Sequence, residues 1–463
     1  MMDHRRSQFT PKLPLLLMIV CCAALIRCVQ LDGDTGATGV PGDVGSEKAW
    51  GQAERISDLS AAPNVALDSD GNGIVVWMQL KVGASGSELW SRTYAHGGEW
   101  GAPERVGETE VDRTGAPAIA ADPDGNAVVV WDQTDGTRYD LWSNRHAPDE
   151  GWSTPQRIER DDAGDTFRPQ VAMDPNGNAV AVWQQFDGTR DNIWANRFTP
   201  RRGWGGAERI EANNNAGGAR NPQVALDSSG NAIAVWQQSD GMRDNIWANR
   251  FTPRRGWGGA KRIEVDNAGK AVAPHIAADP DGNAMAVWQQ SDGTRDNIWA
   301  NHYAPAEGWG AAKRVETRDA GNAEHPRVAM DAQGNAVAVW DQFDGMTFDI
   351  WSNRYAPSSG WGTAKQIEDY DAGEASHPRV VVDPEGNAVV GWYQHDGERD
   401  RIWANRYTPS GGWGTAQPID GHADGLNGHP KLAIAPNGDA MAVWHVALIW
   451  NDPNHGTWVN RLE

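Results

Sequence analysis

The sequence predicts an all-β fold, a single eight-bladed β-propeller of four-stranded blades that is closed by strands from both ends of the chain. Three observations lead to this prediction: a unit of 52 to 54 residues recurs eight times, each copy reads as short strands separated by glycine turns, and the ends of the repeat region complement each other. Of the 463 residues, 53 are Gly and 25 are Trp, a composition typical of many turns and many large aromatic anchors.

Three tryptophans mark each unit. One ends the main apolar run, a second lies in the IWANR segment, and a third lies in GWG or its variants. The first of these recurs at Trp77, Trp131, Trp183, Trp236, Trp288, Trp340, Trp392 and Trp444. The sixteen letters of residues 191–206 also return unchanged at 244–259. A nucleophile or a metal ligand is needed only once, so this duplication indicates architecture.

Within one unit the local pattern is that of four strands. Residues 169–174 form a short apolar run, and the turn PNGN leads into AVAVWQQ at 179–185. The third strand is predicted over 191–198 and the fourth over 204–211. No stretch keeps a 3.6-residue period, so we expect few helices.

The AVAVW strand is apolar on both pleat faces, so it must be covered on both sides. Sheets stacked against similar sheets about 10 Å apart meet this requirement. The first unit begins at its fourth strand, 50–57, and the last stops after its third, 457–463. Joining the two completes an eighth sheet, so residues 50–463 are predicted to form one ring. An open solenoid with stacked sheets is the alternative.

The first 28 residues differ from the rest. Basic residues precede the apolar stretch 13–26, which has the length of a signal segment and is short for a membrane span. We expect export to the cell envelope or the extracellular space. Cys28 is placed as in a bacterial lipoprotein signal, but Arg27 stands where that signal has a small residue. Lipidation of Cys28, simple secretion and an uncleaved anchor all stay open. Residues 29–49 read as a Gly-rich flexible linker.

The formal net charge of −21 narrows the choice of partners. Such a chain repels phosphate backbones and anionic lipid surfaces, so nucleic acid is excluded as a partner class. Membrane contact is expected only through the N-terminal segment. We expect a monomer that needs no cofactor.

Polar loops on one rim are candidates for ligand binding. Connections from second to third strands share this rim, here called the top face, and three of them read QxDGxRD. Their charged residues are Asp187, Arg190, Asp191, Asp240, Arg243, Asp244, Asp292, Arg295 and Asp296. They could hydrogen-bond a sugar or pair with a partner's charges. The alternative is that Asp-Gly makes the turn and that Asp and Arg pair locally. Trp450, outside the repeat scheme, is a candidate aromatic platform or a packing residue.

Three histidines occupy equivalent positions in adjacent units. His325, His377 and His429 each precede the Pro that opens a first strand, at the top of the channel wall. Neutral imidazoles that converge could bind a divalent transition metal. Against this, adjacent inner strands are expected to diverge, and His-Pro can arise by drift among duplicated units. Any specific site is expected in blades 6 to 8.

The unit resembles repeats of uncharacterised exported bacterial β-propellers and, in architecture only, multivalent propeller lectins. Its DxxGN hairpin is similar to the Asp-box of sialidase-like propellers but lacks that motif's serine and aromatic spacing. No GxSxG, HExxH, P-loop or CxxC motif occurs, so no residue can be named as catalytic. The resemblance implies a recognition scaffold that binds a glycan or protein multivalently through its top-face loops. A symmetry-broken enzyme or metal site in blades 6 to 8 is the alternative, and a structural cell-envelope protein is the third.

Overall fold

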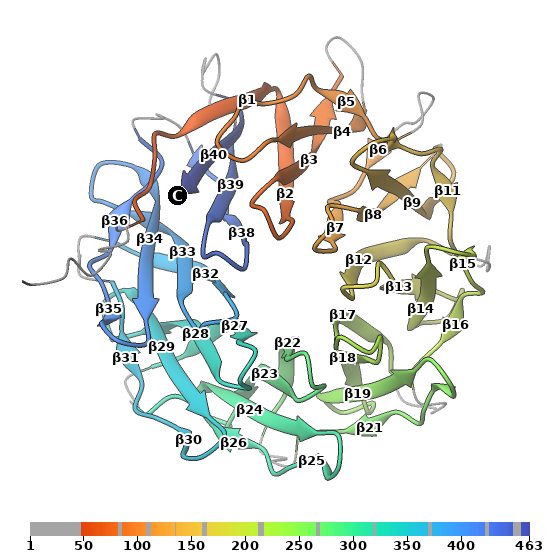
Figure 1. The fold of residues 1–463 in the computed structure, drawn as a ribbon. Coiled ribbons are helices and arrows are strands. Elements are labelled where there is room, and N and C mark those ends of the chain that lie inside the picture. The colour runs from red at the N-terminus through yellow and green to blue at the C-terminus, as the bar shows by residue number, and fades with distance from the viewer. Residues whose placement is uncertain are drawn as a thin grey trace, which may run out of the picture. The chain divides into compact units, whose positions relative to one another are not determined.

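The computed structural model describes residues 48–81, 86–107, 113–134, 136–159, 164–211, 217–264, 269–317, 321–368, 373–421, 426–447 and 455–463. Lys48–Glu463 form one compact unit. The export segment predicted over 1–28, Cys28 within it, and nearly all of the predicted linker lie outside the described residues. The described part is built from strands, arranged as eight antiparallel sheets around a central channel (Figure 1). The predicted eight-bladed propeller is therefore confirmed.

Each blade contributes one strand to the channel wall and three successive strands toward the outside. The first, innermost strands are β2 (Ser60–Leu67), β6 (Arg113–Thr114) with β7 (Ala118–Ala121), β12 (Thr166–Met173), β17 (Ala219–Leu226), β22 (Ala271–Ala278), β27 (Ala323–Met330), β32 (Ala375–Val382), and β37 (Leu426–Asn427) with β38 (Lys431–Ile434). The second strands are β3 (Gly73–Leu80), β8 (Ala127–Thr134), β13 (Ala179–Phe186), β18 (Ala232–Ser239), β23 (Ala284–Ser291), β28 (Ala336–Phe343), β33 (Ala388–His395) and β39 (Ala440–Ala447).

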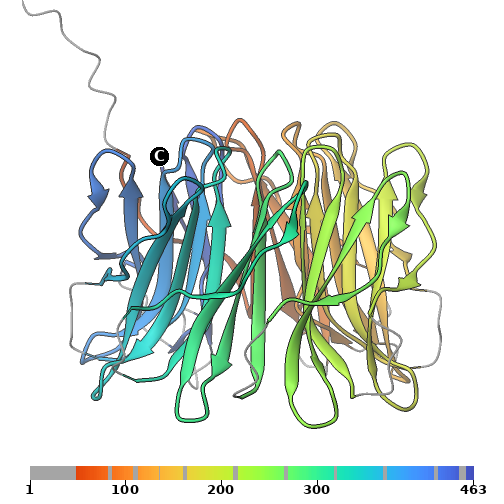
Figure 2. The same ribbon diagram turned by 90° about the horizontal axis from the view of Figure 1, so that it is seen from below.

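The third strands are β4 (Ser87–Tyr94), β9 (Tyr139–Ala147), β14 (Asp191–Thr199), β19 (Asp244–Thr252), β24 (Asp296–Ala304), β29 (Phe348–Ala356), β34 (Asp400–Thr408) and β40 (Gly456–Leu462). The outermost strands are β5 (Glu104–Arg105), β10 (Gly151–Trp152) with β11 (Gln156–Arg157), β15 (Gly203–Trp204) with β16 (Glu208–Arg209), β20 (Gly256–Trp257) with β21 (Lys261–Arg262), β25 (Gly308–Trp309) with β26 (Lys313–Arg314), β30 (Gly360–Trp361) with β31 (Lys365–Gln366), β35 (Gly412–Trp413) with β36 (Gln417–Pro418), and β1 (Glu54–Asp58). The strands run between two rims of loops (Figure 2).

The fourth strand is shorter than the sequence predicts. In blade 3 the expected strand over 204–211 is two short pieces, and the register against β14 shifts by one residue between them. The extra residue is a β-bulge, which lets the outer edge bend and leaves it short. Alternation of side chains alone does not reveal such a bulge.

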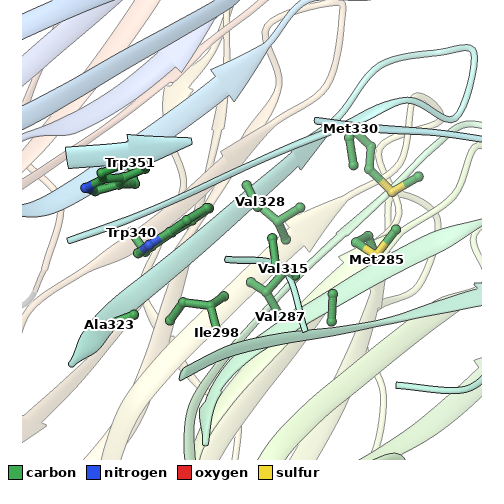
Figure 3. Close-up of a cluster of buried hydrophobic side chains, with 12 residues drawn as sticks. Met285, Val287, Ile298, Val315, Ala323, Val328, Met330, Trp340 and Trp351 are labelled. Atoms are coloured by element: carbon green, nitrogen blue, oxygen red, sulfur yellow. The ribbon is translucent and has the colours of Figure 1, made fainter. Parts of the chain in front are cut away.

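The core lies between blades, as the apolar pleat faces predict. The tryptophan that ends the apolar run within each second strand is fully buried in all eight blades. Figure 3 shows one inter-blade cluster, in which Met285, Val287 and Ile298 of blade 5 pack against Val328 and Trp340 of blade 6. In seven blades the indole N–H is satisfied within its own strand, as where Trp183 Nε1 donates to Gln185 Oε1 at 3.1 Å. Blade 8 has Val446 in place of the glutamine, and the buried Trp444 Nε1 has no hydrogen-bond partner among the described residues. The Trp-x-Gln spacing is therefore structural.

The asparagine of the IWANR segment ties each blade to the one before it. Asn196 Nδ2 donates to the carbonyl oxygen of Ile158 in the preceding blade, at 2.9 Å, and to that of Gly205 in its own. The same pair of bonds is made by Asn144, Asn249, Asn301, Asn353, Asn405 and Asn460. Blade 1 has Arg92 instead, whose guanidinium donates to Gly101 O and Ile56 O. The sequence that is duplicated at 191–206 and 244–259 thus repeats a hydrogen bond between neighbouring blades.

A buried carboxylate follows the outer strand in most blades. In blade 3, Glu211 Oε2 accepts the backbone N–H of Ile193 at 3.1 Å, and Glu211 Oε1 lies 3.2 Å from Arg209 Nε. Burial raises the pKa of Glu211 to about 7. Glu159 and Glu368 hold the same position, and burial raises the pKa of Glu159 to about 7 and that of Glu368 to about 8.

The two ends of the ring meet as predicted. β1 pairs with β40, with Glu54 opposite Val459 and Ser57 opposite Thr457, so that blade 8 takes its outermost strand from the start of the repeat region. Trp50 bridges Leu462 further along the same edge. This closure gives every sheet a neighbour on both faces, and the open solenoid is excluded. None of the described residues form a helix with the length and apolar character to cross a membrane.

Candidate functional site at the channel mouth

The inner strand of most blades carries a bulge at its X-Pro step. In β12 the pairing with β13 shifts register between Phe167 and Gln170, and Arg168 adopts φ 52°. The residue before proline has positive φ at Ala62, Arg168, Asn221, Ala273, His325 and His377. Proline disfavours the α region for its predecessor, and a left-handed non-glycine residue is strained. These strained residues lie at the mouth of the channel.

The three histidines predicted as metal ligands form a stack. The ring centroids of His325 and His377 are 3.9 Å apart and those of His377 and His429 are 3.8 Å apart, with interplanar angles of 27° and 22°. The three side chains therefore converge at this rim, where His325 and His377 have positive φ. His325 Nδ1 also lies 3.0 Å from Asp341 Oδ2.

The pKa shifts within this stack differ in direction. The hydrogen bond to Asp341 raises the pKa of His325. Burial, together with the charge on its two neighbours, lowers the pKa of His377 to about 3, and burial with nearby cations lowers that of His429 to about 4. Two of the three rings are therefore neutral near pH 7.

Metal binding by this stack stays a prediction. Near-parallel rings present faces to one another and do not aim three nitrogens at one point. Across the part of the chain that the structure describes, no group of three or more His, Cys, Asp or Glu residues is arranged to hold a metal ion.

The residue after each of these prolines was not singled out from the sequence, and it forms the more distinctive feature. It occupies one register position of the inner strand, opposite the Val of the second strand in most blades. In chain order the residues are Asn64, Ala118, Gln170, Gln223, His275, Arg327, Arg379 and Lys431. Three successive blades thus contribute a cation, and we call Arg327, Arg379 and Lys431 the basic arc.

The basic arc has no countercharge among the described residues, since no carboxylate there forms an ion pair with any of its three members. Arg327 Nη1 donates only to the adjacent Pro326 carbonyl, at 2.9 Å, and the buried Nε of Arg379 has no hydrogen-bond partner in the described chain. Burial lowers the pKa of Arg379 to about 10. The charge on Arg379, followed by burial, lowers the pKa of Lys431 to about 7.

A cavity of about 350 Å³ lies over this position of the channel. Arg327 and Lys431 of the basic arc line it, together with Asn64, Gln170 and Gln223. Its size falls within the range of small-ligand sites. His275 borders the same region, because the charges of Arg379 and Lys431 add to burial in lowering its pKa to about 3. Guanidinium and ammonium groups opposite neutral amides suit a ligand that carries a carboxylate, sulfate or phosphate beside hydroxyl groups.

The predicted top-face loop residues lie on separate blades, and their carboxylates cap their own turns. Asp187 Oδ1 accepts the N–H groups of Thr189 and Arg190, each at 2.9 Å. The hydrogen bond from the Thr189 hydroxyl, together with these backbone bonds, holds the pKa of Asp187 far below its usual range, and backbone hydrogen bonds from Arg243 and Met242 lower that of Asp240 to about 2. The Asp292 carboxylate makes the same turn and lies 3.8 Å from Arg295 Nε.

The remaining loop residues are equally local. Arg243 Nε lies 4.0 Å from Asp240, and Asp296 accepts the side chain of Gln289 at 2.8 Å. Asp191, Asp244 and Asp296 each begin a third strand, and Arg190 precedes the first of them. These contacts fit the structural alternative, and ligand binding by the loops stays a prediction. Trp450 lies outside the described residues.

Comparison with known proteins yields fold neighbours only. No family model and no curated protein matches the sequence. Among solved structures, an ulvan lyase of polysaccharide lyase family 25, bound to -[GlcA(1-4)Rha3S]-, superposes with a TM-score of 0.50 at 10% identity over 88% of this chain and 94% of its own. The polysaccharide lyase Uly1 gives 0.50 at 10% identity over 75% and 89%. The Aleuria aurantia lectin, in complex with Fucalpha1-6GlcNAc, gives 0.39 at 12% identity over 67% and 96%.

Proposed function

We propose that this protein is an exported recognition protein that binds a glycan through an anionic group of the sugar, held in the cavity at the channel mouth that Arg327 and Lys431 line. The observation that carries the proposal is the basic arc, three adjacent cations without a countercharge among the described residues. Charges left uncompensated in a partly buried site cost stability, so their placement together favours a role in binding an anion.

A uronic acid or sulfated sugar fits the chemistry of both walls. Arginine binds carboxylates and sulfates through paired N–H groups, and the amides of Gln170 and Gln223 can hydrogen-bond ring hydroxyls. The ulvan lyase neighbour, bound to a sulfated uronate saccharide, is consistent with this ligand class. The proposal differs from multivalent loop binding in one respect, since a single channel gives one site per ring.

The test compares acidic and neutral ligands. Calorimetric titration with a short glucuronate-containing oligosaccharide should show one site per chain, and the matched neutral oligosaccharide should bind at least about tenfold more weakly. Arg327→Gln, at a residue that lines the cavity, should weaken binding of the acidic ligand by a further factor of about 10 to 100, because a charge-assisted bond contributes about 1.5–3 kcal/mol. Equal binding of acidic and neutral oligosaccharides would overturn the proposal.

A second candidate is enzymatic, and one observation favours it. Lys431 lies beside Arg379, whose charge lowers the pKa of Lys431 to about 7, as a general base requires near neutral pH. In this version Arg327 holds the carboxylate of a uronate while Lys431 removes the proton from the carbon next to that carboxylate. The bond from the following carbon to the glycosidic oxygen breaks as the double bond forms, and the leaving oxygen takes up a proton from water. Incubation with acidic polysaccharide would then produce the ultraviolet absorbance of a new carbon–carbon double bond. Binding without such absorbance leaves recognition as the function.

A further inference from the structure

At four blade junctions of the described chain, an arginine from one blade lies over an aromatic ring of the next. The distance from the guanidinium carbon to the ring centroid is 5.7 Å for Arg197 over Phe251 and 5.9 Å for Arg250 over Tyr303. It is 4.2 Å for Arg354 over Tyr407. In each case the arginine directly follows the Asn that hydrogen-bonds to the preceding blade, so its position is set by the repeat.

The junction between blades 8 and 1 shows the complete arrangement. Arg461 lies 4.4 Å above the centroid of Tyr94 and forms an ion pair with Glu54 of the outer strand β1. Trp100 Nε1 donates to the same Glu54 carboxylate at 2.7 Å. The guanidinium is thus enclosed by a carboxylate, an aromatic ring and the indole beside them.

The next junction, between blades 1 and 2, has a carboxylate, an aromatic ring and an indole at the same positions but lacks the cation, and its indole, Trp152 Nε1, donates to Ser91 Oγ at 2.8 Å and not to the carboxylate. Glu104 stands at the register position of Glu54, and His146 and Trp152 replace Tyr94 and Trp100. Thr93 stands where the other blade has Arg461. A threonine cannot span to the next blade, so the site of the guanidinium is left open.

Three features of the open junction indicate a ligand. A cavity of about 510 Å³ is lined by Thr93, Glu104, His146 and Glu150. Glu104 has no ion-pair partner within the described ranges. His146 is only 7% exposed, and its Nδ1 has no hydrogen-bond partner among the described atoms. A buried polar atom without a partner is costly, and a ligand would relieve that cost.

Two other junctions also enclose cavities, but each already holds its own occupant. Arg145 and Phe198 line a cavity of about 370 Å³ between blades 2 and 3. Between blades 5 and 6, where the cavity is about 190 Å³, His302 stacks on Tyr355 with ring centroids 5.3 Å apart. A retained carboxylate combined with a missing cation is thus specific to the pocket of Thr93.

We propose that the pocket between blades 1 and 2 binds a guanidinium group, presented by an arginine side chain or by a free arginine-like molecule. The ligand would place its guanidinium over the His146 ring and against Glu104, as Arg461 lies over Tyr94 and against Glu54. Burial lowers the pKa of His146, so the imidazole stays neutral and does not repel the cation. The remaining volume accommodates the alkyl chain and backbone of the ligand. This site is independent of the basic arc.

The test uses the full protein and three probes, which are L-arginine, a short blocked peptide that contains arginine, and citrulline. Calorimetric titration with L-arginine, and with the same residue in a short blocked peptide, distinguishes a free ligand from a side chain. Citrulline, which has the shape of arginine without its charge, should bind at least about tenfold more weakly than arginine. If citrulline binds as well as arginine to the native protein, the proposal is wrong.

Two variants locate the site. Thr93→Arg restores the arginine of the repeat, so it should abolish arginine binding and leave the thermal midpoint equal or higher. Glu104→Gln should weaken binding at least about tenfold. The matched control is Glu208→Gln, an exposed glutamate at the same register position in blade 3, where Arg197 already covers Phe251. Unchanged binding by Thr93→Arg, or equal losses in Glu104→Gln and Glu208→Gln, would overturn the proposal.

Discussion

The two halves of the channel wall share one backbone and differ in charge. Blades 1 to 4 present Asn64, Ala118, Gln170 and Gln223 at the position after the X-Pro step, whereas blades 5 to 8 present His275, Arg327, Arg379 and Lys431. Pairing register is the same in both halves, with a valine opposite in nearly every blade. The difference therefore lies in side chains alone.

Positions that agree between blades maintain the ring, and positions that differ without affecting packing are where a specific site can arise. Trp183 in the neutral half and Trp392 in the charged half are both fully buried and make the same bond to a glutamine two residues later. Repetition is thus a guide to stability, and departures from it at the channel and the junctions are a guide to binding.

The largest effect should come from substitutions in the buried core that both halves of the ring share. Trp183→Ala and Trp392→Ala each leave a large cavity and should each lower the free energy of unfolding by about 3–5 kcal/mol. Chemical denaturation measures both. Because the frame is common to the two halves, the two losses should agree to within about 1 kcal/mol; a loss confined to one half would contradict the equivalence.

The next largest effect should come from making the charged wall neutral. The triple variant Arg327→Gln, Arg379→Gln and Lys431→Gln should bind the acidic oligosaccharide about 100-fold or more weakly, while its thermal midpoint stays equal or rises. Its control changes charge equally at exposed sites, with Arg201→Gln, Arg254→Gln and Lys313→Gln. Equal loss of binding in the control would mean that net charge, and not the channel, attracts the ligand.

A smaller effect on stability is expected from the buried glutamates, which are part of the structure that both halves share. Burial raises the pKa of Glu211 to about 7, so the folded state favours its protonated form. The stability this confers is complete below the unfolded pKa and is lost as pH rises toward 7. Glu211→Gln keeps an acceptor for the Ile193 N–H and should remove about 1–2 kcal/mol of the fall in stability between about pH 5 and pH 8. Glu208→Gln, at an exposed site nearby, should leave that pH profile unchanged.

The smallest predicted effect sharpens the role of one residue in the charged wall. The pKa of Lys431 is lowered to about 7, so its ammonium charge disappears as pH rises through neutrality. Affinity for an acidic ligand should therefore fall about 3- to 10-fold between about pH 6 and pH 8, measured by titration calorimetry. Lys431→Gln should bind more weakly and lose this dependence; a wild-type affinity that does not change over this range would contradict the assignment.

Much of the fold could be predicted because its causes are local and repeated. The tryptophan spacing fixed the blade number, and the complementary ends, 50–57 and 457–463, predicted the closure. Two features of the backbone were missed. The outer strand is split by a bulge, and the residue before each inner-strand proline has positive φ in most blades. Neither changes the apolar alternation from which strands are read.

The site was less predictable, for a different physical reason. The expectation that any specific site lies in blades 6 to 8 stays a prediction. The histidines before the prolines were predicted as metal ligands, and they stack as rings. The basic arc can be read from the sequence as Arg327, Arg379 and Lys431 at equivalent positions, one residue beyond each proline. That no carboxylate among the described residues pairs with them follows only from the folded arrangement. Thr93 was equally visible, as a single departure from an arginine of the repeat.

The pairing of β1 with β40 predicts where the ring begins to unfold. The hydroxyl groups of Ser60 and Thr457, 397 residues apart in sequence, lie 2.7 Å from each other in the seam. Bringing such distant segments together costs chain entropy of about 5 kcal/mol, a cost that grows only with the logarithm of the loop length. Amide protons on both sides of this seam should exchange with solvent earlier than those of blades 3 to 5. The two ends of the chain are held together there by strand pairing without a covalent link, so local unfolding should begin at the seam.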